Sequence, residues 1–298
     1  MKISDVSHFM DNTKIKNDGE FEACGLINTN ISKKIISFIE NKKYIQDISE
    51  DISCIFIKKE LYEFIPKHLG IIICENPRAE FYKLHNSLCN NCKDYFREKY
   101  KTTIGVGSKI SEKSIISKYN VTIGENVTIE ENVIIRENVI IGNDSIIRAG
   151  SIIGGEGFLF NRTNDDKIIP GNHAGGVLIG KDVEIQYNCC VDKAIFPWDY
   201  TIIGDSTKTD NLVHIGHAVK IGKRCLFPAN SVIGGYTVIG DDSWIGVGAT
   251  VSNNIIIGDK CRISIGAVAT KNVESRKTVS GNFAIEHSKF LDFIRKIR

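Results

Sequence analysis

The chain has 298 residues, a formal net charge of +2 and 25% charged residues. This length allows two domains. The near balance of charge, without a basic stripe interleaved with aromatic residues, argues against a nucleic-acid-binding protein. Residues 1–12 lack an apolar signal-peptide core and no run of 18 apolar residues occurs, so neither export nor a membrane span is predicted.

Nine cysteines are scattered along the chain. An odd number without the spacing of a disulfide framework predicts free thiols in a reducing cytoplasm. Cys89 and Cys92 form an isolated CxxC pair. A structural zinc site normally has a second such pair, so no metal site is predicted here.

Residues 1–100 show no sustained repeat and predict a small α/β domain. Strands are expected over 21–27, 54–57 and 70–74, with a turn at 41–43. Helices are expected over 59–65 and 77–100, and Pro77 suits the first turn of the second helix.

From Ile104 to about Ala269 an aliphatic residue recurs at intervals of six, with one residue inserted before Ile123 and with Thr209 and Phe227 as exceptions. An amphipathic helix repeats at 3.6 residues and a surface strand at 2, whereas a period of six is typical of a parallel β-helix. Three repeats close a coil of about 18 residues, and the aliphatic side chains stack inside it. We therefore predict a β-helix domain over 101–270, with Gly and Asn at corners that require positive φ.

The repeat is interrupted between Gly154 and Val177, which predicts a loop extruded near 155–177. Long insertions of this kind are often functional. The register resumes at Ile179 and holds through Ile203, although the aromatic segment 196–200 lies inside it. That segment is interpreted either as a lid over a ligand or as a bulged corner.

Residues 271–298 are predicted to form a C-terminal tail with one short helix over 283–298. The helix combines an apolar face with basic residues. The simpler interpretation is a cap on the open end of the β-helix, because a run of charge is usually a solvated face. The functional alternative is a docking surface for an acidic carrier protein.

Asp210 and His217 lie on opposite sides of a predicted corner of the β-helix. A carboxylate that binds one imidazole nitrogen fixes the tautomer and leaves the other nitrogen free as a general base. Spacing alone favours a plainer interpretation, in which Asp210 caps the corner and His217 is an exposed loop residue. His214 is a weaker candidate because it directly precedes the inward residue Ile215.

Five segments carry more information than the repeat. They read ISFIENKKY at 36–44, NPRAEF at 76–81, GGEGF at 154–158, IQYNCCVDK at 185–193 and DNLVHIGH at 210–217. In this order, and over nearly the whole chain, they resemble segments of the UDP-3-O-acylglucosamine N-acyltransferase family of the lipid A pathway. The combination of both domains makes the resemblance specific.

The resemblance implies an N-terminal uridine-binding α/β domain, a left-handed parallel β-helix and a C-terminal helix, assembled as a homotrimer with active sites between subunits. It implies a nucleotide-sugar acceptor and no tightly bound cofactor. The acyl donor would be an acyl-carrier-protein thioester or an acyl-CoA, so acyl carrier protein is an expected partner.

The resemblance also implies roles for single residues. His217 would be the general base, Asp210 would orient it, and the backbone N–H of Gly235, one coil further along, would stabilise the oxyanion. Phe38 and Tyr44 would enclose the uracil ring and Asn41 would bind its edge. Ordinary core packing is the alternative for the two aromatic residues.

Three features depart from the family pattern. Asn254 stands where the family has a second active-site histidine, so this position can hydrogen-bond a phosphate or a sugar but cannot carry positive charge. The C-terminal helical extension is reduced to one short helix, and Gly216 replaces an alanine. As a substrate-binding residue, Asn254 is expected to act through its amide.

Three functions remain as hypotheses. The first is an N-acyltransferase that transfers an acyl group, such as a 3-hydroxyacyl group, to the amine of a UDP-linked sugar in lipid A or another surface glycan. The second is an acetyl-CoA-dependent N-acetyltransferase that acts on a dTDP- or UDP-amino sugar for an O-antigen, capsule or flagellar glycan. The third is a metal-dependent β-helix protein with His214 and His217 as ligands, which the lack of a third nearby histidine disfavours.

Overall fold

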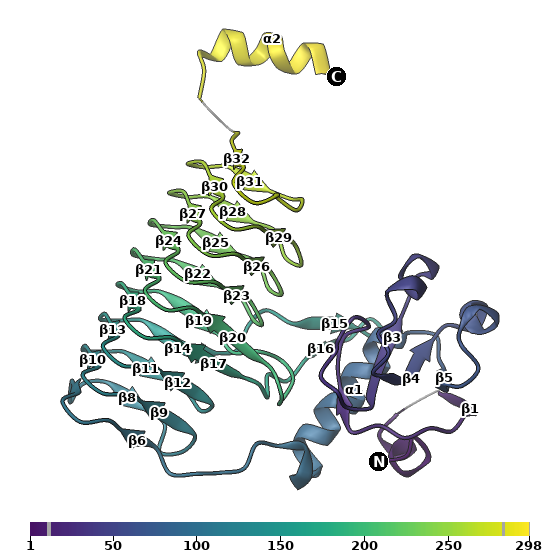
Figure 1. Cartoon of the computed structure of the whole chain (residues 1–298). Coiled ribbons are helices and arrows are strands. Elements are labelled where there is room, and N and C mark those ends of the chain that lie inside the picture. The colour runs from purple at the N-terminus through teal and green to yellow at the C-terminus, as the bar shows by residue number, and fades with distance from the viewer. Residues whose placement is uncertain (11–12, 282–283, 298) are drawn as a thin grey trace. The chain divides into compact units, whose positions relative to one another are not determined.

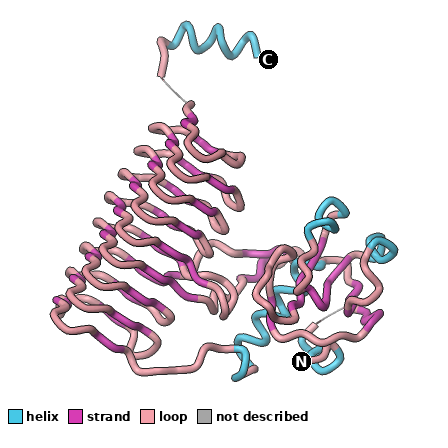
Figure 2. The backbone as a smooth tube through the Cα atoms, viewed as in Figure 1, coloured by secondary structure: helices cyan, strands magenta, loops and turns pink. Residues whose placement is uncertain are grey.

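The computed structural model describes residues 1–10, 13–281 and 284–297, and the chain divides into two compact units. The first contains residues 1–98, 156–175 and 195–199, and the second contains the remaining described residues. Figure 1 shows the elements of both units, and Figure 2 shows that the second is built almost entirely of short strands and turns.

A five-stranded sheet forms the framework of the first unit, in the order β1-β5-β4-β3-β2. β1 is antiparallel to β5 and the other neighbours are parallel. The strands are β1 (Lys14–Asn17), β2 (Ala23–Cys24), β3 (Ile35–Ile39), β4 (Ile52–Ile57) and β5 (Gly70–Ile73). The helices are η1 (Ser4–Phe9), η2 (Lys42–Asp47), η3 (Lys59–Phe64), η4 (Lys93–Tyr95) and α1 (Pro77–Asn91), of which all but α1 are 3-10 helices.

Two predicted elements of this unit are shorter than expected. The strand predicted over 21–27 is only β2, and the helix predicted over 77–100 ends at Asn91. α1 begins as predicted, because the Asn76 side chain accepts a hydrogen bond from the Ala79 N–H and Pro77 occupies the first turn. Beyond its end, the Tyr95 hydroxyl lies 2.8 Å from His85 Nδ1, a buried contact back to α1 that a continuous helix would not make.

The insertion near 155–177 is an ordered β-hairpin. β15 (Phe160–Arg162) pairs antiparallel with β16 (Ile168–Pro170). Asn86 on α1 donates to the Pro170 carbonyl at 2.7 Å and accepts from the Asn172 N–H at 2.8 Å. The insertion therefore packs on α1 within the first unit.

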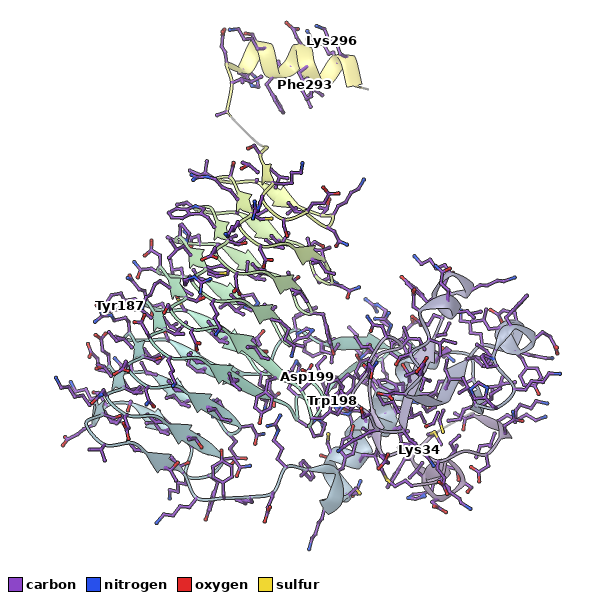
Figure 3. The ribbon with its side chains drawn as sticks, in the orientation of Figure 1. Lys34, Tyr187, Trp198, Asp199, Phe293 and Lys296 are labelled. Atoms are coloured by element: carbon purple, nitrogen blue, oxygen red, sulfur yellow. The ribbon has the colours of Figure 1, made fainter. Side chains whose placement is uncertain are left out.

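The aromatic segment 196–200 was interpreted as a lid or a bulged corner, and the structure shows neither. Phe196 is fully buried and its ring stacks on that of Trp198 at 5.7 Å. Trp198 Nε1 donates to the carbonyl of Cys24 at 2.9 Å; Trp198 is labelled in Figure 3. Residues 195–199 thus contribute to the core of the first unit.

The second unit is a parallel β-helix with three sheets, each named here by one of its strands. The β24 sheet contains β7 (Lys109–Ile110), β10 (Thr128–Ile129), β13 (Ile146–Ile147), β18 (Glu184–Ile185), β21 (Lys208–Thr209), β24 (Leu226–Phe227), β27 (Trp244–Ile245), β30 (Arg262–Ile263) and β32 (Thr278–Val279). The β22 sheet contains β8 (Ile115–Ile116), β11 (Ile134–Ile135), β14 (Ile152–Gly155), β19 (Cys190–Asp192), β22 (His214–Ile215), β25 (Val232–Ile233), β28 (Thr250–Val251) and β31 (Val268–Ala269). The β23 sheet contains β6 (Thr103–Ile104), β9 (Val121–Ile123), β12 (Val139–Ile141), β17 (Gly176–Ile179), β20 (Tyr200–Ile203), β23 (Lys220–Ile221), β26 (Val238–Ile239) and β29 (Ile256–Ile257).

The six-residue repeat determines which side chains enter the core. From Ile123 onward its aliphatic residues are buried and stack from coil to coil; Ile215, for example, is 1% exposed and pairs with the buried Ile233. Neighbouring coils from β20 to β31 are 18 residues apart, as the contact between Lys223 and Asp241 shows. The predicted β-helix is confirmed, and its pairing extends past Ala269 to β32.

The glycines after the aliphatic positions are needed for a different reason from the one predicted. At Gly204 an added Cβ would lie 2.4 Å from the backbone oxygen of Gly222 in the next coil. Positive φ occurs two residues later, at positions such as Ser206 and Arg224. Glycine after an aliphatic position is thus mostly required for close approach between coils, while the left-handed corners are taken by Asn, Asp and other residues and by some glycines, such as Gly248 and Gly266.

We expect Gly204→Ala to lower stability by about 1–3 kcal/mol, because the Cβ meets a backbone atom that cannot move away. The midpoint of thermal unfolding would measure the loss. Gly281→Ala is the matched control, since an added Cβ there meets nothing within 4 Å. Equal midpoints for the two variants would contradict this explanation of the glycine pattern.

The C-terminal helix is α2 (His287–Ile297), shorter than the predicted 283–298. Phe283 and Arg298 of that prediction lie outside the described residues. The apolar residues Phe290 and Phe293 are about half exposed, so the structure does not show the capping contact that was the simpler interpretation. Every helix within the described ranges is too short or too polar to span a lipid bilayer. All nine cysteines are free.

Candidate active site

The predicted catalytic residues lie at one corner of the β-helix. The chain turns there from β22 to β23, and Ala218 takes the left-handed conformation with φ 57°. The same corner recurs in the next two coils, where the Tyr236 N–H donates to the His217 carbonyl and the Asn254 N–H donates to the Gly235 carbonyl, both at 2.9 Å. We call this column the His217 corner. It brings His217, Gly235 and Asn254 onto successive coils.

The imidazole of His217 faces Gly235. A Cβ added to Gly235 would lie 2.6 Å from His217 Nε2, so only glycine leaves room for the ring. The ring also meets that of Tyr236 edge-on, with 5.4 Å between the ring centres. Burial, and to a lesser degree the nearby His214, lowers the pKa of His217 below its ordinary value of 6.5. The imidazole is therefore neutral near pH 7 and can accept a proton.

The backbone N–H of Gly235 is available beside this imidazole. The N–H groups on either side of it donate to the Val251 and His217 carbonyls, whereas no residue in the described part of the chain accepts a hydrogen bond from Gly235. A backbone N–H at a water-accessible corner can stabilise an oxyanion that forms next to it. The arrangement thus places a base and an oxyanion donor side by side.

The structure shows Asp210 in a local contact. Its Oδ1 accepts a hydrogen bond from the Asn211 N–H at 2.7 Å, the corner-capping role that spacing alone favoured. Close to this corner, His214 Nε2 lies 3.7 Å from Asp192 Oδ2. Orientation of His217 by Asp210 stays a prediction.

Sequence reasoning ranked His214 low and missed Asp192. Cys190 on β19 pairs with His214 on β22. The coil between them is 24 residues long, as it is between Tyr187 and Asn211, whereas a regular coil has about 18 residues. Residues 195–199, which belong to the first unit, lengthen this coil by about one repeat. The six-residue register of the aliphatic positions is therefore unchanged. Counting coils of 18 therefore concealed that Asp192 lies one coil before His214.

The predicted uridine-binding residues lie around the end of β3 in the first unit. The ring of Phe38 contacts those of Phe81 and Tyr82 on α1, at 5.1 and 6.2 Å, and the Arg78 guanidinium lies 5.3 Å from it. Tyr44 is 44% exposed. The Asn41 side chain oxygen caps η2 by accepting from the Lys43 N–H. Phe38 thus has the packing contacts of a core residue as well as a partly exposed face.

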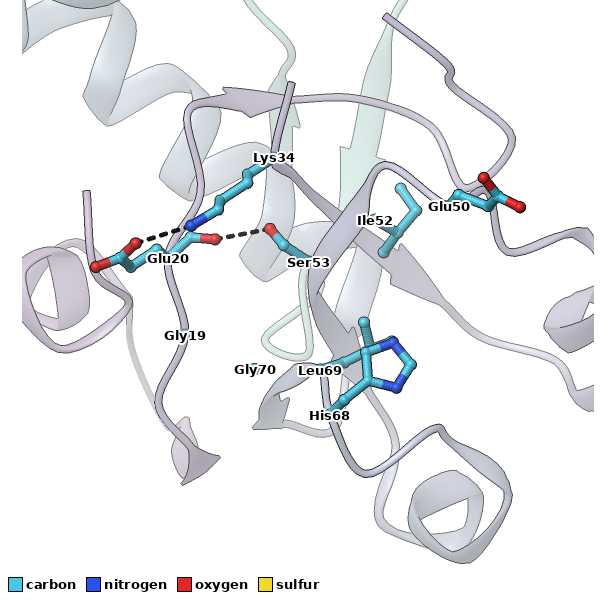
Figure 4. A pocket seen from close by; sticks show the side chains of 9 residues that line it. All are labelled: Gly19, Glu20, Lys34, Glu50, Ile52, Ser53, His68, Leu69 and Gly70. Atoms are coloured by element: carbon cyan, nitrogen blue, oxygen red, sulfur yellow. Dashed lines mark hydrogen bonds and ion pairs between the residues drawn. The ribbon is translucent and has the colours of Figure 1, made fainter. Parts of the chain in front are cut away.

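A separate cleft of about 380 Å³ lies at the opposite end of β3. Lys34, just before β3, forms an ion pair with Glu20 in its wall at 2.9 Å, and Ser53 donates to the Glu20 carbonyl (Figure 4). Its lining residues are Gly19, Glu20, Lys34, Glu50, Ile52, Ser53, His68, Leu69 and Gly70. None of the predicted uridine-binding residues lines this cleft.

Comparison with known proteins identifies the class first. Residues 120–155 and 200–235 match the family model of the bacterial transferase hexapeptide (six repeats), and residues 236–271 match that of the hexapeptide repeat of succinyl-transferase. A solved structure of a UDP-N-acetylglucosamine acyltransferase matches with a TM-score of 0.55 at 24% identity, over 66% of this chain and 78% of that one. The protein is thus a hexapeptide-repeat protein with a left-handed β-helix.

Two curated relatives define the family. The UDP-3-O-acylglucosamine N-acyltransferase of Helicobacter hepaticus is 35% identical over 88% of this chain and 85% of its own length. That of Campylobacter lari is 31% identical over 100% of this chain and 97% of its own length. The chain belongs to the UDP-3-O-acylglucosamine N-acyltransferase family.

Proposed function

We propose that this enzyme transfers an acyl group from a thioester to the amino group of a UDP-linked amino sugar, in lipid A or a related surface-glycan pathway. The observation that carries the proposal is the neutral imidazole of His217 beside the Gly235 N–H. Family membership supports the same reaction. In this proposal residues 1–100 form the uridine-binding domain and residues 101–270 form the acyltransferase domain.

The reaction follows from the chemistry of the two groups. The sugar amine attacks the thioester carbonyl, and His217 accepts the proton that the amine must lose. The carbonyl oxygen becomes negatively charged as the new C–N bond forms, and the Gly235 N–H stabilises it. Collapse of this intermediate forms the amide and expels the thiolate. The thiolate takes up a proton, and protonated His217 is the proposed donor. Asp210 is proposed to orient His217, and Asn254 to bind the sugar or phosphate through its amide.

The acyl donor is proposed to be an acyl-carrier-protein thioester, with acyl-CoA as the alternative. α2 supports the carrier protein, because it combines exposed Phe290 and Phe293 with the basic residues Lys289, Arg295 and Lys296. Phe293 and Lys296 are labelled in Figure 3. An acidic carrier would pair its charges with such a surface. No tightly bound cofactor takes part in this mechanism.

A homotrimer is proposed from the exposed apolar residues of the β-helix. The β22 and β23 sheets meet at the His217 corner, and both carry outward aliphatic side chains, with Val268 56% and Ile256 54% exposed. The β24 sheet instead directs Glu184, Lys208 and Arg262 outward. Burial of the two apolar faces against other copies would place His217 between subunits and leave the charged face in solvent.

Ile256→Glu is expected to reduce the assembled mass and the turnover together, because it places a charge on a proposed contact face. Light scattering coupled to size-exclusion chromatography measures the mass. Leu226→Glu is the matched control, since Leu226 is an exposed aliphatic residue of the charged β24 sheet. Loss of the trimer in both variants, or in neither, would contradict the assignment of the faces.

Thermal shift with UDP, dTDP, acetyl-CoA and a long-chain acyl carrier protein tests the substrate class. A ligand that binds the folded state raises the unfolding midpoint by mass action. We expect UDP to stabilise the wild type and to lose this effect in Phe38→Ala, because a stacking partner of the base is removed. Phe64→Ala, an exposed aromatic residue on η3, serves as the control. Stabilisation by dTDP or acetyl-CoA instead would favour an acetyltransferase acting on another amino sugar.

A further inference from the structure

Arg78 lies over the ring of Phe38, one of the two aromatic residues proposed to enclose the uracil. The central carbon of its guanidinium is 5.3 Å from the centre of that ring. Phe81 and Tyr82 on α1 pack against the same ring, which is half-buried, whereas the side chain of Arg78 is 52% exposed. The guanidinium therefore lies on the solvent side of the ring, and a base that stacks there must displace it.

The same guanidinium is bound by a carboxylate. Arg78 Nε donates to Glu40 Oε2 at 3.1 Å, and Glu40 directly follows β3. Both partners of the guanidinium thus come from one end of β3, the strand that carries Phe38. A guanidinium has five N–H donors and this hydrogen bond uses one of them, so the group has donors left for a further anion.

Folding stability does not explain this placement of Arg78. The residue lies in the first turn of α1, the end of a helix at which the peptide dipoles disfavour a positive charge. Its ion pair with Glu40 joins two solvent-exposed side chains, and such pairs contribute little because water screens them. A cation over an aromatic ring at an exposed position adds only a modest amount. A ligand that replaces both contacts explains the arrangement better.

A nucleoside diphosphate can replace both contacts of the guanidinium. Its base would take the place of Arg78 on the ring of Phe38, and its phosphate oxygens would take the place of the Glu40 carboxylate. A planar guanidinium binds phosphate through two parallel N–H···O hydrogen bonds, which are stronger than those between neutral groups. Lys43, whose Nζ lies 4.6 Å from the centre of the Tyr44 ring, adds positive charge beside the second proposed uracil contact.

We propose that Arg78 is a specificity-determining residue of the nucleotide site: it covers Phe38 when the site is empty and transfers to the diphosphate when a base stacks on that ring. This inference rests on the uridine site proposed above. A free nucleoside must displace the guanidinium without offering it an anion, whereas a nucleoside diphosphate binds the displaced group. Arg78 thus makes the site select nucleoside diphosphates over free nucleosides.

The ¹⁹F NMR signals of 5-fluorouridine and of its diphosphate, titrated with the full chain, measure both affinities at the base itself. We expect Arg78→Ala to raise the dissociation constant of the diphosphate about tenfold or more, because charge-assisted hydrogen bonds to phosphate are lost. The dissociation constant of the nucleoside should instead fall about two- to fivefold, because Phe38 is no longer covered. Lys34→Ala is the matched control and should change neither constant. It removes a cation from a similarly exposed ion pair, with Glu20, at the opposite end of β3 (Figure 4).

Phe38→Ala separates this inference from the proposed function. If both probes need Phe38 but Arg78→Ala leaves the ratio of their dissociation constants unchanged, the inference is overturned and the uridine site stands. Equal weakening of both probes in Arg78→Ala leaves the same ratio and would show a packing role only. Binding that does not need Phe38, or no binding to the wild type, would disprove the uridine site and the inference with it. Arg78→Gln, which removes the charge and keeps a long side chain, gives the same answer if Arg78→Ala fails to fold.

Discussion

His217→Ala is expected to lower kcat/KM by about 10²–10⁴-fold, the range that a positioned general base contributes. The imidazole of His217 is the one that faces Gly235, so its removal takes the proposed base away from the proposed oxyanion donor. Release of the carrier or CoA thiol, measured as initial rate with a UDP-amino sugar, gives the effect. The wild-type rate should also fall as pH decreases through the pKa of His217, which burial holds below 6.5.

Two controls make this result specific. His8→Gln removes an imidazole of the first unit and should retain the wild-type rate. UDP should still stabilise His217→Ala against heat, because the residues proposed to bind uracil lie in the first unit. A variant that keeps near-native turnover and the wild-type pH profile would remove His217 from the mechanism and leave the fold assignment intact.

The repeat made the β-helix predictable because each coil must bury the same inward position. A polar residue at an inward position of the repeat would be buried against the coils on both sides, so the aliphatic period is kept from Ile179 to Ala269 with few exceptions. Thr209 is buried and still fits, because its hydroxyl accepts from the Gln186 N–H. The reason for the glycines was not predictable from composition, since it depends on the distance between neighbouring coils.

The errors in the first unit have a different origin. Local sequence indicates where α1 begins, through Asn76 and Pro77, but its end depends on a tertiary contact. Tyr95 is buried against His85, and the Asn172 carbonyl lies on the other side of the same imidazole. A residue 87 positions away along the chain therefore helps to fix the end of this helix, and no pattern within 77–100 contains that information.

Contacts within the candidate site could be predicted from the sequence where the coils have a constant length, and could not be predicted where a coil is longer. His217 and Gly235 meet because the coils from β20 to β31 keep 18 residues, so counting along the repeat places them together. Asp192 and His214 meet across a coil of 24 residues, whose extra segment packs in the first unit. An insertion equal in length to one repeat preserves the period and displaces the partners, which is why the proximity of Asp192 and His214 could not be predicted from the spacing of the repeat.

Gly235→Ala is expected to lower kcat by about 10²-fold, since misplacing a catalytic group by about 1 Å can cost this much. The new methyl group would lie 2.6 Å from His217 Nε2 and within 3 Å of two ring carbons, so the imidazole must rotate or shift. The Gly235 N–H is retained, and a loss of rate would therefore report the position of the base. Single-turnover rates separate this effect from substrate binding.

The comparison with Gly281→Ala isolates the contact with the imidazole, because that position has open space for a methyl group. Gly281→Ala should retain the wild-type rate and stability. The double variant Gly235→Ala/His217→Ala provides the decisive step: if the methyl group acts by displacing the base, it should have little further effect once the imidazole is absent. Losses that multiply would mean instead that Gly235 acts independently of His217, through the geometry of its own N–H toward the oxyanion.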